Sequence, residues 1–216
     1  MAFKTRLVKI LSGFCLLTAL SMPVYAQQRP FDYYLMSLSW SPEFCATRPE
    51  DRQCGRGYGL VLHGVWPQYN KGYPSSCSNQ RISAQLLRQF PDLYPSQKLA
   101  FHEWQKHGTC SSLSPEGYLQ LSQSLKQSFI APTELQNLNQ PLRVTSAQLT
   151  KMILTANPKL NEQAIALTCK DSGRFLQEIL VCYDNAGANA IACGADVQRR
   201  SQKSCGQNNF LVRNIR

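Results

Sequence analysis

Four side chains that can move protons or bind anions lie close together in the middle of the chain. His102, Glu103, Lys106 and His107 fall within six residues and include two of the three histidines in the sequence. If this segment is helical, His102 and Lys106 are four residues apart, as are Glu103 and His107, so all four side chains project from one surface. The third histidine is His63. We expect the two segments to meet in space and form a reaction centre.

The sequence around His102 partly matches a zinc metallopeptidase signature. In that signature, His-Glu-x-x-His, two histidines four residues apart bind one metal ion. Here His102 and His107 are five apart, and Lys106 occupies the place of the second ligand. A serine hydrolase is also disfavoured, because the chain contains no Gly-x-Ser-x-Gly element. The pattern therefore argues against both classes, and no metal or cofactor is expected.

Two histidines with a lysine and a glutamate suit phosphoryl transfer on RNA without a metal. An imidazole with an ordinary pKa of about 6.5 can accept a proton or donate one near neutrality. A base would deprotonate the ribose 2′-hydroxyl, the oxygen would attack phosphorus, and an acid would protonate the leaving 5′-oxygen. A lysine and a protonated histidine would stabilise the negative charge on the phosphate oxygens. A single histidine is more often structural, but three in two segments favour catalysis.

The first 26 residues have the pattern of a secretory signal peptide. Lysine and arginine side chains precede an apolar run at Ile10–Leu20, and small residues follow at Val24 and Ala26. The apolar run is too short for an ordinary transmembrane helix, and no later segment approaches the roughly 20 apolar residues needed. We therefore expect a periplasmic or secreted protein without a membrane span, with residues 27–216 forming one domain.

Cysteine usage agrees with export. Of nine cysteines, Cys15 lies in the leader, and eight remain: Cys45, Cys54, Cys77, Cys110, Cys169, Cys182, Cys193 and Cys205. An even number in an exported chain predicts disulfides, although eight cysteines allow 105 pairings and spacing alone selects none of them. Zinc binding is disfavoured because no Cys-x-x-Cys is present.

The net charge is +10 for the whole chain and about +7 without the leader. This charge favours a polyanionic partner such as RNA, but charge that serves only solubility would give the same balance.

Strands are expected near both ends of the domain. Phe31–Trp40 reads as a buried strand stopped by a proline, and Tyr58–His63 as a second strand broken by Gly64, which places His63 at a strand end. A loop is expected at Pro67–Asn79. Leu176–Tyr183 and Phe210–Val212 are also strand-like.

Helices are expected between these strands. Apolar residues have helical spacing at Ile82–Phe90, and a helix from Ser96 to Gly108 would carry the reactive cluster. Ser114 begins a third helix, and Thr145 with Gln148 forms a capping-box pattern for a fourth. We predict a single α+β domain in which a mixed or antiparallel sheet packs against several helices and disulfides stabilise the fold. The strand order stays open.

The segments LHGVWPQ and HEWQKHGTC resemble the two active-site segments of the ribonuclease T2 family. The resemblance extends from Phe31–Tyr34 through GYPSSC to LQEILVCYD and so covers nearly all of the chain after the leader. It implies an α+β fold and a metal-independent endoribonuclease that cleaves single-stranded RNA with low base specificity. The products would be 2′,3′-cyclic phosphates and then 3′-phosphates. A monomer without an obligate protein partner is expected.

The resemblance also implies a role for each reactive residue. His107 matches the general base and His63 the general acid. His102 matches a phosphate-binding histidine, while Glu103 and Lys106 would polarise the phosphate and stabilise the transition state.

Base contacts follow from the same resemblance. Trp66 matches a tryptophan that packs against a bound base, although a core position is an equal alternative, and Tyr73 is a candidate for the other side of the base. Gln68 stands where some members have an acidic residue that contacts the base, so base preference does not transfer. Pro95 and Ser96 would border a second base site.

The disulfide pairs implied by the resemblance are Cys45–Cys54, Cys77–Cys110, Cys169–Cys205 and Cys182–Cys193. The alternative function is a non-catalytic RNA-binding or toxic exported protein on the same fold.

Overall fold

The computed structural model describes Met1 and residues 31–205 and 208–216. The predicted leader therefore lies, except for Met1, outside the described residues. Among the described residues, no helix has the length and apolar character that a membrane crossing requires.

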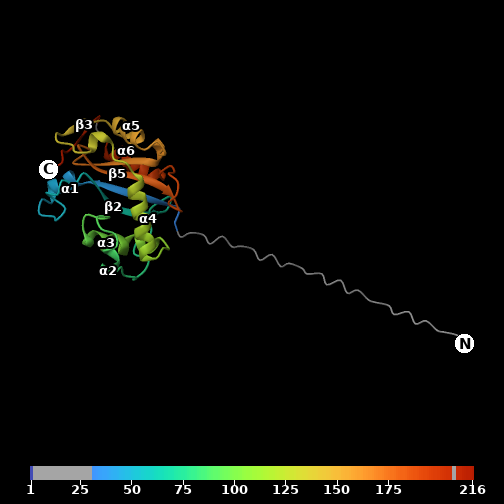
Figure 1. Ribbon diagram of the computed structural model, residues 1–216. Coiled ribbons are helices and arrows are strands. Elements are labelled where there is room, and N and C mark those ends of the chain that lie inside the picture. Colours follow the sequence, from blue (N-terminus) through green and yellow to red (C-terminus); the bar gives the residue numbers. More distant parts are fainter. Residues whose placement is uncertain (2–30, 206–207) are drawn as a thin grey trace.

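One six-stranded sheet forms the centre of the molecule (Figure 1). Its strands are β1 (Tyr33–Trp40), β2 (Leu60–Gln68), β3 (Leu142–Val144), β4 (Ile165–Lys170), β5 (Phe175–Asp184) and β6 (Phe210–Val212). The order is β2-β1-β5-β6-β3, and β4 also pairs with β5. All pairs are antiparallel except β5 with β6. The mixed sheet confirms the predicted α+β class.

The helices are α1 (Ser41–Thr47), α2 (Ala84–Leu87), α3 (Gln97–Lys106), α4 (Pro115–Ser128), α5 (Ser146–Ala156) and α6 (Ala195–Ser204). Short 3₁₀ turns occupy Gly108–Cys110, Thr133–Leu135 and Glu162–Ala164. In Figure 1, α2 and α3 lie beyond β2 at one end of the molecule, whereas α5 and α6 lie toward the other end.

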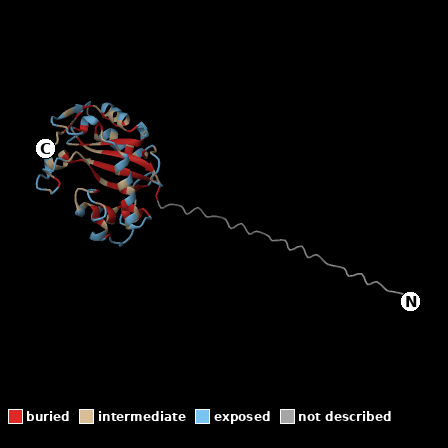
Figure 2. Cartoon of the chain, viewed as in Figure 1, coloured by how far each residue is buried: buried red, intermediate tan, exposed pale blue. Residues whose placement is uncertain are grey.

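The central strand β1 is buried on both faces, as the red strands of Figure 2 show. Because side chains alternate along a strand, Tyr34, Met36 and Leu38 point together into the main hydrophobic core. On the opposite face Leu35 belongs to a smaller cluster with residues of β4, β5 and α6. That face becomes polar at Ser37, and we call it the site face because the reactive groups lie over it.

The second strand differs from the sequence prediction. It runs from Leu60 to Gln68, so the expected strand end at Gly64 is wrong, and the following loop begins after Gln68 rather than at Pro67. Proline is tolerated because β2 is an edge strand of the sheet, where no ladder partner needs its missing N–H.

His63 is the extra residue of a β-bulge in this strand. Gly64 pairs with Ser37 and Leu62 with Leu38, so no residue of β1 is paired with His63. His63 therefore lies in the middle of β2 and not at its end.

The predicted helices are largely present. Ser96 caps α3 by accepting the N–H of Leu99, and α3 ends at Lys106, with His107 as the capping residue. The capping box of Thr145 and Gln148 is confirmed at α5. The helix expected at Ile82–Phe90 is shorter, Ala84–Leu87, and the helices α1 and α6 and the strands β3 and β4 were not predicted.

Four disulfides join the same pairs that the family resemblance implies. Cys77–Cys110 ties the loop after β2 to the turn that follows α3, and Cys169–Cys205 ties the end of α6 to β4. The end of α3 and the end of α6, which border the site face, are thus each attached by a disulfide to another part of the fold.

Candidate active site

The eight residues proposed from the sequence for catalysis, phosphate binding or the first base site line one pocket of about 590 Å³ on the site face. These residues are His63, Trp66, Gln68, Tyr73, His102, Glu103, Lys106 and His107. They come from β2, from the loop after it and from the end of α3. The sheet supplies Leu35, Thr168, Gln177, Glu178 and Leu180 as further lining residues. The two segments that carry the three histidines do meet in space.

His63 is held between two carboxylates. Its Nδ1 lies 2.7 Å from Oε1 of Glu178 on β5, and its Nε2 lies 3.6 Å from Oε1 of Glu103 on α3. Glu178 is fixed in turn, since its carboxylate accepts hydrogen bonds from the hydroxyls of Ser37 and Thr168 at 3.1 and 3.3 Å.

Glu178 was not identified from the sequence. The available signal was a glutamate inside the otherwise apolar strand segment LQEILVCY, where an acidic side chain needs a partner. The partner is 115 residues away in the sequence, so only the pairing of β1 with β5 and β2 brings the two residues together.

Electrostatics gives His63 a raised pKa. Burial alone would lower it, but the hydrogen bond and charge of Glu178 and the charge of Glu103 favour the protonated ring and raise the pKa above its ordinary value. Burial would raise the pKa of Glu178, yet the hydrogen bond and charge of His63 lower it. The pair is therefore stabilised as imidazolium and carboxylate.

His107 has the opposite electrostatic environment. Only 5% of its surface is exposed. Burial, followed by the positive charge of Lys106 and the neighbouring histidines His102 and His63, lowers its pKa to about 3. This ring is therefore neutral near pH 7. Among the described residues no hydrogen-bond partner reaches its Nδ1.

Two aromatic rings flank His107. The ring centroids of Trp66 and Tyr73 lie 5.1 and 5.7 Å from that of His107. Tyr73 is exposed, and Trp66 is half-buried, with its indole N–H donating to Oε2 of Glu103 at 2.6 Å. Trp66 thus lines the pocket while also packing against the smaller cluster that contains Leu35.

Gln68 is buried, and its amide N–H donates to the carbonyl of Pro67 at 3.0 Å. His102, in contrast, is largely exposed on α3, one turn before Lys106. The remaining partial burial of its ring, together with the charge of Lys106, lowers its pKa. His102 and Lys106 present N–H groups from the same side of the helix.

A neighbouring pocket of about 560 Å³ contains Pro95 and Ser96, the residues proposed for a second base site. It shares His63, His102, Gln177 and Glu178 with the first pocket. The two pockets therefore meet at His63 and His102.

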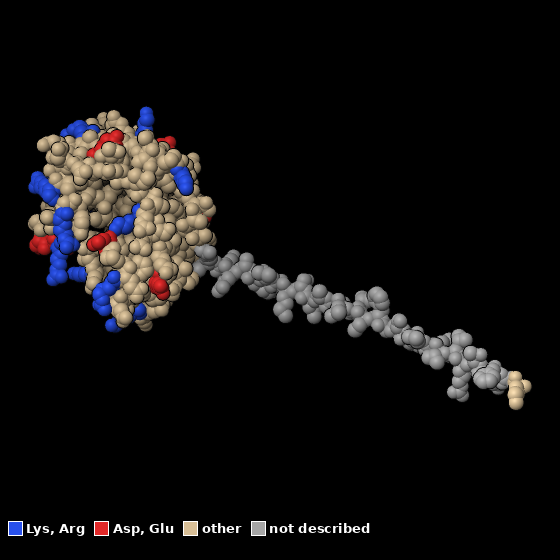
Figure 3. Space-filling model, viewed as in Figure 1, with Lys and Arg blue, Asp and Glu red and all other residues tan. Residues whose placement is uncertain are grey.

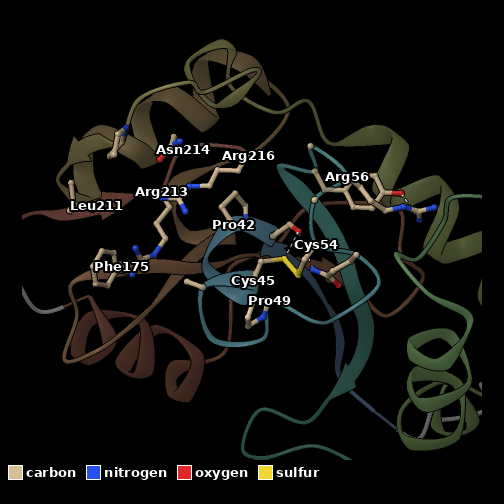
Figure 4. A pocket seen from close by; sticks show the side chains of 17 residues that line it. Pro42, Cys45, Pro49, Cys54, Arg56, Phe175, Leu211, Arg213, Asn214 and Arg216 are labelled. Carbon is tan, nitrogen blue, oxygen red and sulfur yellow. Dashed lines mark hydrogen bonds between the residues drawn. A yellow bond between two sulfur atoms is a disulfide. The ribbon is translucent and has the colours of Figure 1, made fainter.

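A third pocket, of about 350 Å³, surrounds the Cys45–Cys54 disulfide (Figure 4). It contains none of the residues proposed for the site. Arg213 in its wall is already engaged, because its guanidinium lies 3.8 Å from the centre of the Phe175 ring and pairs with Glu43. This pocket belongs to the packing of the C-terminal segment.

Two further properties of the molecule are its surface charge and its capacity to hold a metal ion. On the face drawn in Figure 3, lysine and arginine side chains outnumber acidic ones, and several gather along the left edge. Within residues 31–205 and 208–216, no group of three or more histidine, cysteine or acidic side chains is arranged to hold a metal ion.

Comparison with known proteins identifies relatives of this chain. A model of the ribonuclease T2 family matches residues 31–193. The chain is 42% identical over 194 residues to a ribonuclease of Aeromonas hydrophila, covering 86% of this chain and 87% of the relative. It is 30% identical over 200 residues to ribonuclease S-7 of Nicotiana alata, covering 83% and 88%.

Solved structures agree in fold. Ribonuclease MC1 from bitter gourd seeds superposes with a TM-score of 0.66 at 19% identity, covering 83% of this chain and 99% of that chain. Trichomaglin, an S-like ribonuclease, gives a TM-score of 0.67 at 17% identity, covering 86% and 99%.

Gly64 is required by the close approach of α3 to β2. A Cβ at this position would lie 2.2 Å from Oε2 of Glu103 and 2.3 Å from Nε1 of Trp66, the two atoms of the hydrogen bond described above. Gly64→Ala should therefore break that bond and lower the free energy of unfolding by about 1–3 kcal/mol, measured by denaturant titration. Gly117→Ala is the matched control, since its Cβ would lie 3.3 Å from Ser114 Oγ at the start of a helix. Equal stability of the two variants would contradict the packing described here.

Proposed function

Because the chain belongs to the ribonuclease T2 family, we propose that it is an endoribonuclease that cleaves single-stranded RNA without a metal ion. The observation that carries this proposal is a pair of histidines in one pocket, one with a raised pKa and the other with a lowered pKa. Acid–base catalysis needs one proton donor and one proton acceptor at the same pH, and these two environments supply them.

In the first step His107 acts as the base and His63 as the acid. The neutral His107 ring takes the proton of the ribose 2′-hydroxyl, and the resulting oxygen forms a bond to the adjacent phosphorus. The bond from phosphorus to the 5′-oxygen of the next nucleotide breaks, and protonated His63 gives its proton to that oxygen. The products are a 2′,3′-cyclic phosphate and a free 5′-hydroxyl.

In the second step the two histidines exchange roles. His63, now neutral, takes a proton from water as the water oxygen attacks phosphorus. The bond from phosphorus to the 2′-oxygen breaks, and protonated His107 returns its proton to that oxygen. The product is a 3′-phosphate, and both histidines recover their starting protonation states.

The other polar side chains act on the phosphate. Lys106 and His102 lie one turn apart on α3 and offer N–H groups to the non-bridging oxygens, where negative charge grows in the transition state. Glu103 would polarise the phosphate and help to stabilise the transition state, while its charge favours the protonated form of His63.

The base of the attacked nucleotide would stack against Trp66 and Tyr73, which flank His107. Stacking of a base on an aromatic side chain contributes about 1–3 kcal/mol and tolerates every base. The amide N–H of Gln68 is already bonded to a backbone carbonyl. Low base specificity follows from a site that relies on stacking.

The proposal also includes the export of the protein and its domain organisation. Residues 1–26 would act as a signal peptide, and residues 27–216 would form one monomeric catalytic domain in the periplasm or outside the cell. Four disulfides suit an oxidising compartment. A non-catalytic RNA-binding protein on the same fold is the alternative, but such a protein has no need of two histidines with opposed pKa shifts.

The reaction is tested by incubating the oxidised mature protein with single-stranded RNA and with DNA of the same sequence in excess EDTA. The proposal predicts cleavage of RNA to 2′,3′-cyclic phosphates and then 3′-phosphates, while DNA stays intact because it lacks the 2′-hydroxyl. End analysis by mass spectrometry distinguishes the products. His107→Ala, purified in the same way, controls for contaminating nuclease. Loss of activity in EDTA, equal cutting of DNA, or RNA binding without cleavage would contradict the proposal.

Glu178→Gln tests whether the charge of Glu178 raises the pKa of His63. His63 must be protonated to act as an acid, so a raised pKa extends activity to higher pH, and loss of the Glu178 charge should move the basic limb of the pH–rate profile down by about one unit or more. The acidic limb should not move, because Glu178 is not among the groups that shift the pKa of His107.

Thr168→Val is the matched control, because it removes only one neutral hydrogen bond to Glu178. It should shift the basic limb far less than Glu178→Gln does. Identical profiles for the wild type and Glu178→Gln would exclude the proposed role of the carboxylate.

A further inference from the structure

One face of α6 borders the pocket that contains the reactive histidines. Val197, Arg200, Lys203 and Ser204 line this pocket together with His63, Lys106 and His107. The function proposed above uses none of these α6 residues. Arg199 is equally exposed but does not line the pocket.

The fold fixes the position of this helix. The backbone N–H groups of Leu167 and Cys169 on β4 donate to the hydroxyls of Ser201 and Ser204, both at 2.8 Å. The disulfide of Cys169 and Cys205 joins the same two elements. The helix therefore covers the edge of β4 that does not pair with β5, and Arg200 and Lys203 are carried on a firmly attached support.

The helix lies across the site face from α3. Thr168 of β4 donates to Oε2 of Glu178, and Oε1 of Glu178 contacts His63. Glu178 lies on β5, and α6 is attached to β4. These two strands are neighbours in the sheet, about 4.8 Å apart. The pocket thus has the reactive histidines on one side and the two cations of α6 on the other.

The charges of this second side are available to a ligand. Within the part of the chain that the structure describes, neither Arg200 nor Lys203 forms an ion pair with an acidic side chain. The acidic residues that line the pocket are Glu103 and Glu178, and Glu103 is 1% exposed while 12% of the Glu178 side chain is exposed. An anion that enters beside α6 meets two exposed cations.

The direction in which the RNA chain runs through the site indicates which of its phosphate groups lies beside α6. This step rests on the proposed function, in which the nucleotide that supplies the 2′-hydroxyl lies at His107, Trp66 and Tyr73. These three residues line this pocket together with Arg200 and Lys203. The leaving nucleotide would extend toward the neighbouring pocket with Pro95 and Ser96, which shares His63 and His102 with this one. The strand that precedes the attacked nucleotide therefore leaves through the pocket that α6 borders.

We propose that Arg200 and Lys203 form a binding subsite for the phosphate group on the 5′ side of the attacked nucleotide. The ligand is a phosphate monoester or diester at the 5′-oxygen of the base-stacked nucleoside. The subsite adds affinity for chains that extend in the 5′ direction and carries no base preference, because it contacts only phosphate.

A binding measurement tests the subsite without requiring cleavage. A dinucleotide with a 2′-deoxy first sugar lacks the nucleophile, and it is titrated with and without a 5′-phosphate by calorimetry at low salt. The wild type should bind the 5′-phosphorylated form about two- to thirtyfold more tightly, and the ratio should fall as salt rises. In Arg200→Ala/Lys203→Ala the ratio should approach one.

Arg199→Ala is the control for Arg200→Ala, since each removes one charge from adjacent positions on α6, and Arg199→Ala should keep the wild-type ratio whereas Arg200→Ala should lower it. Circular dichroism and thermal unfolding verify that each variant is folded. A wild-type ratio near one, or an unchanged ratio in the double variant, would overturn the subsite. Failure of the proposed function is separate, because it would appear as intact RNA in the cleavage assay whatever the binding ratio.

Discussion

The hydrogen bond between His63 and Glu178, 2.7 Å long, depends on an irregularity in β2. In a regular strand, residues 63 and 66 would point to opposite faces, because side chains alternate with a period of two. The bulge at His63 changes this alternation, so Leu62 and Val65 remain in the main core while His63 and Trp66 both lie over the site face, with ring centroids 5.1 Å apart. Without the extra residue, the strand could not place both rings in the pocket and also fill the core.

The opposed pKa shifts of the two histidines arise from different balances of the same two effects. Burial disfavours the charged form of both rings. At His63 the adjacent carboxylates of Glu178 and Glu103 outweigh burial, whereas His107 has no carboxylate among the causes of its shift and is next to Lys106. One pocket therefore holds a ring that favours the proton beside a ring that does not, without a metal ion in the proposed reaction.

Much of the site could be predicted from local sequence, and what could not was set by contacts between distant segments. The spacing of His102, Glu103, Lys106 and His107 placed the cluster on a helix whose Ser96 cap is confirmed. Gly64 was interpreted as a strand end, but its missing side chain instead leaves room for Glu103 and Trp66. Glu178 lies in a different strand, and no local pattern connects it to His63. The helix α6 was missed because it is almost entirely polar, with Val197 as its buried residue.

The central claim is that the same pocket raises the pKa of His63 and lowers the pKa of His107. Nuclear magnetic resonance of the ¹⁵N-labelled imidazoles, followed as a function of pH and assigned with single histidine variants, measures both pKa values directly. The account predicts that His63 titrates above about 6.5, the ordinary value, and that His107 stays neutral until the pH approaches about 3. Titration of both rings together near the ordinary value, or a lower pKa for His63 than for His107, would contradict it.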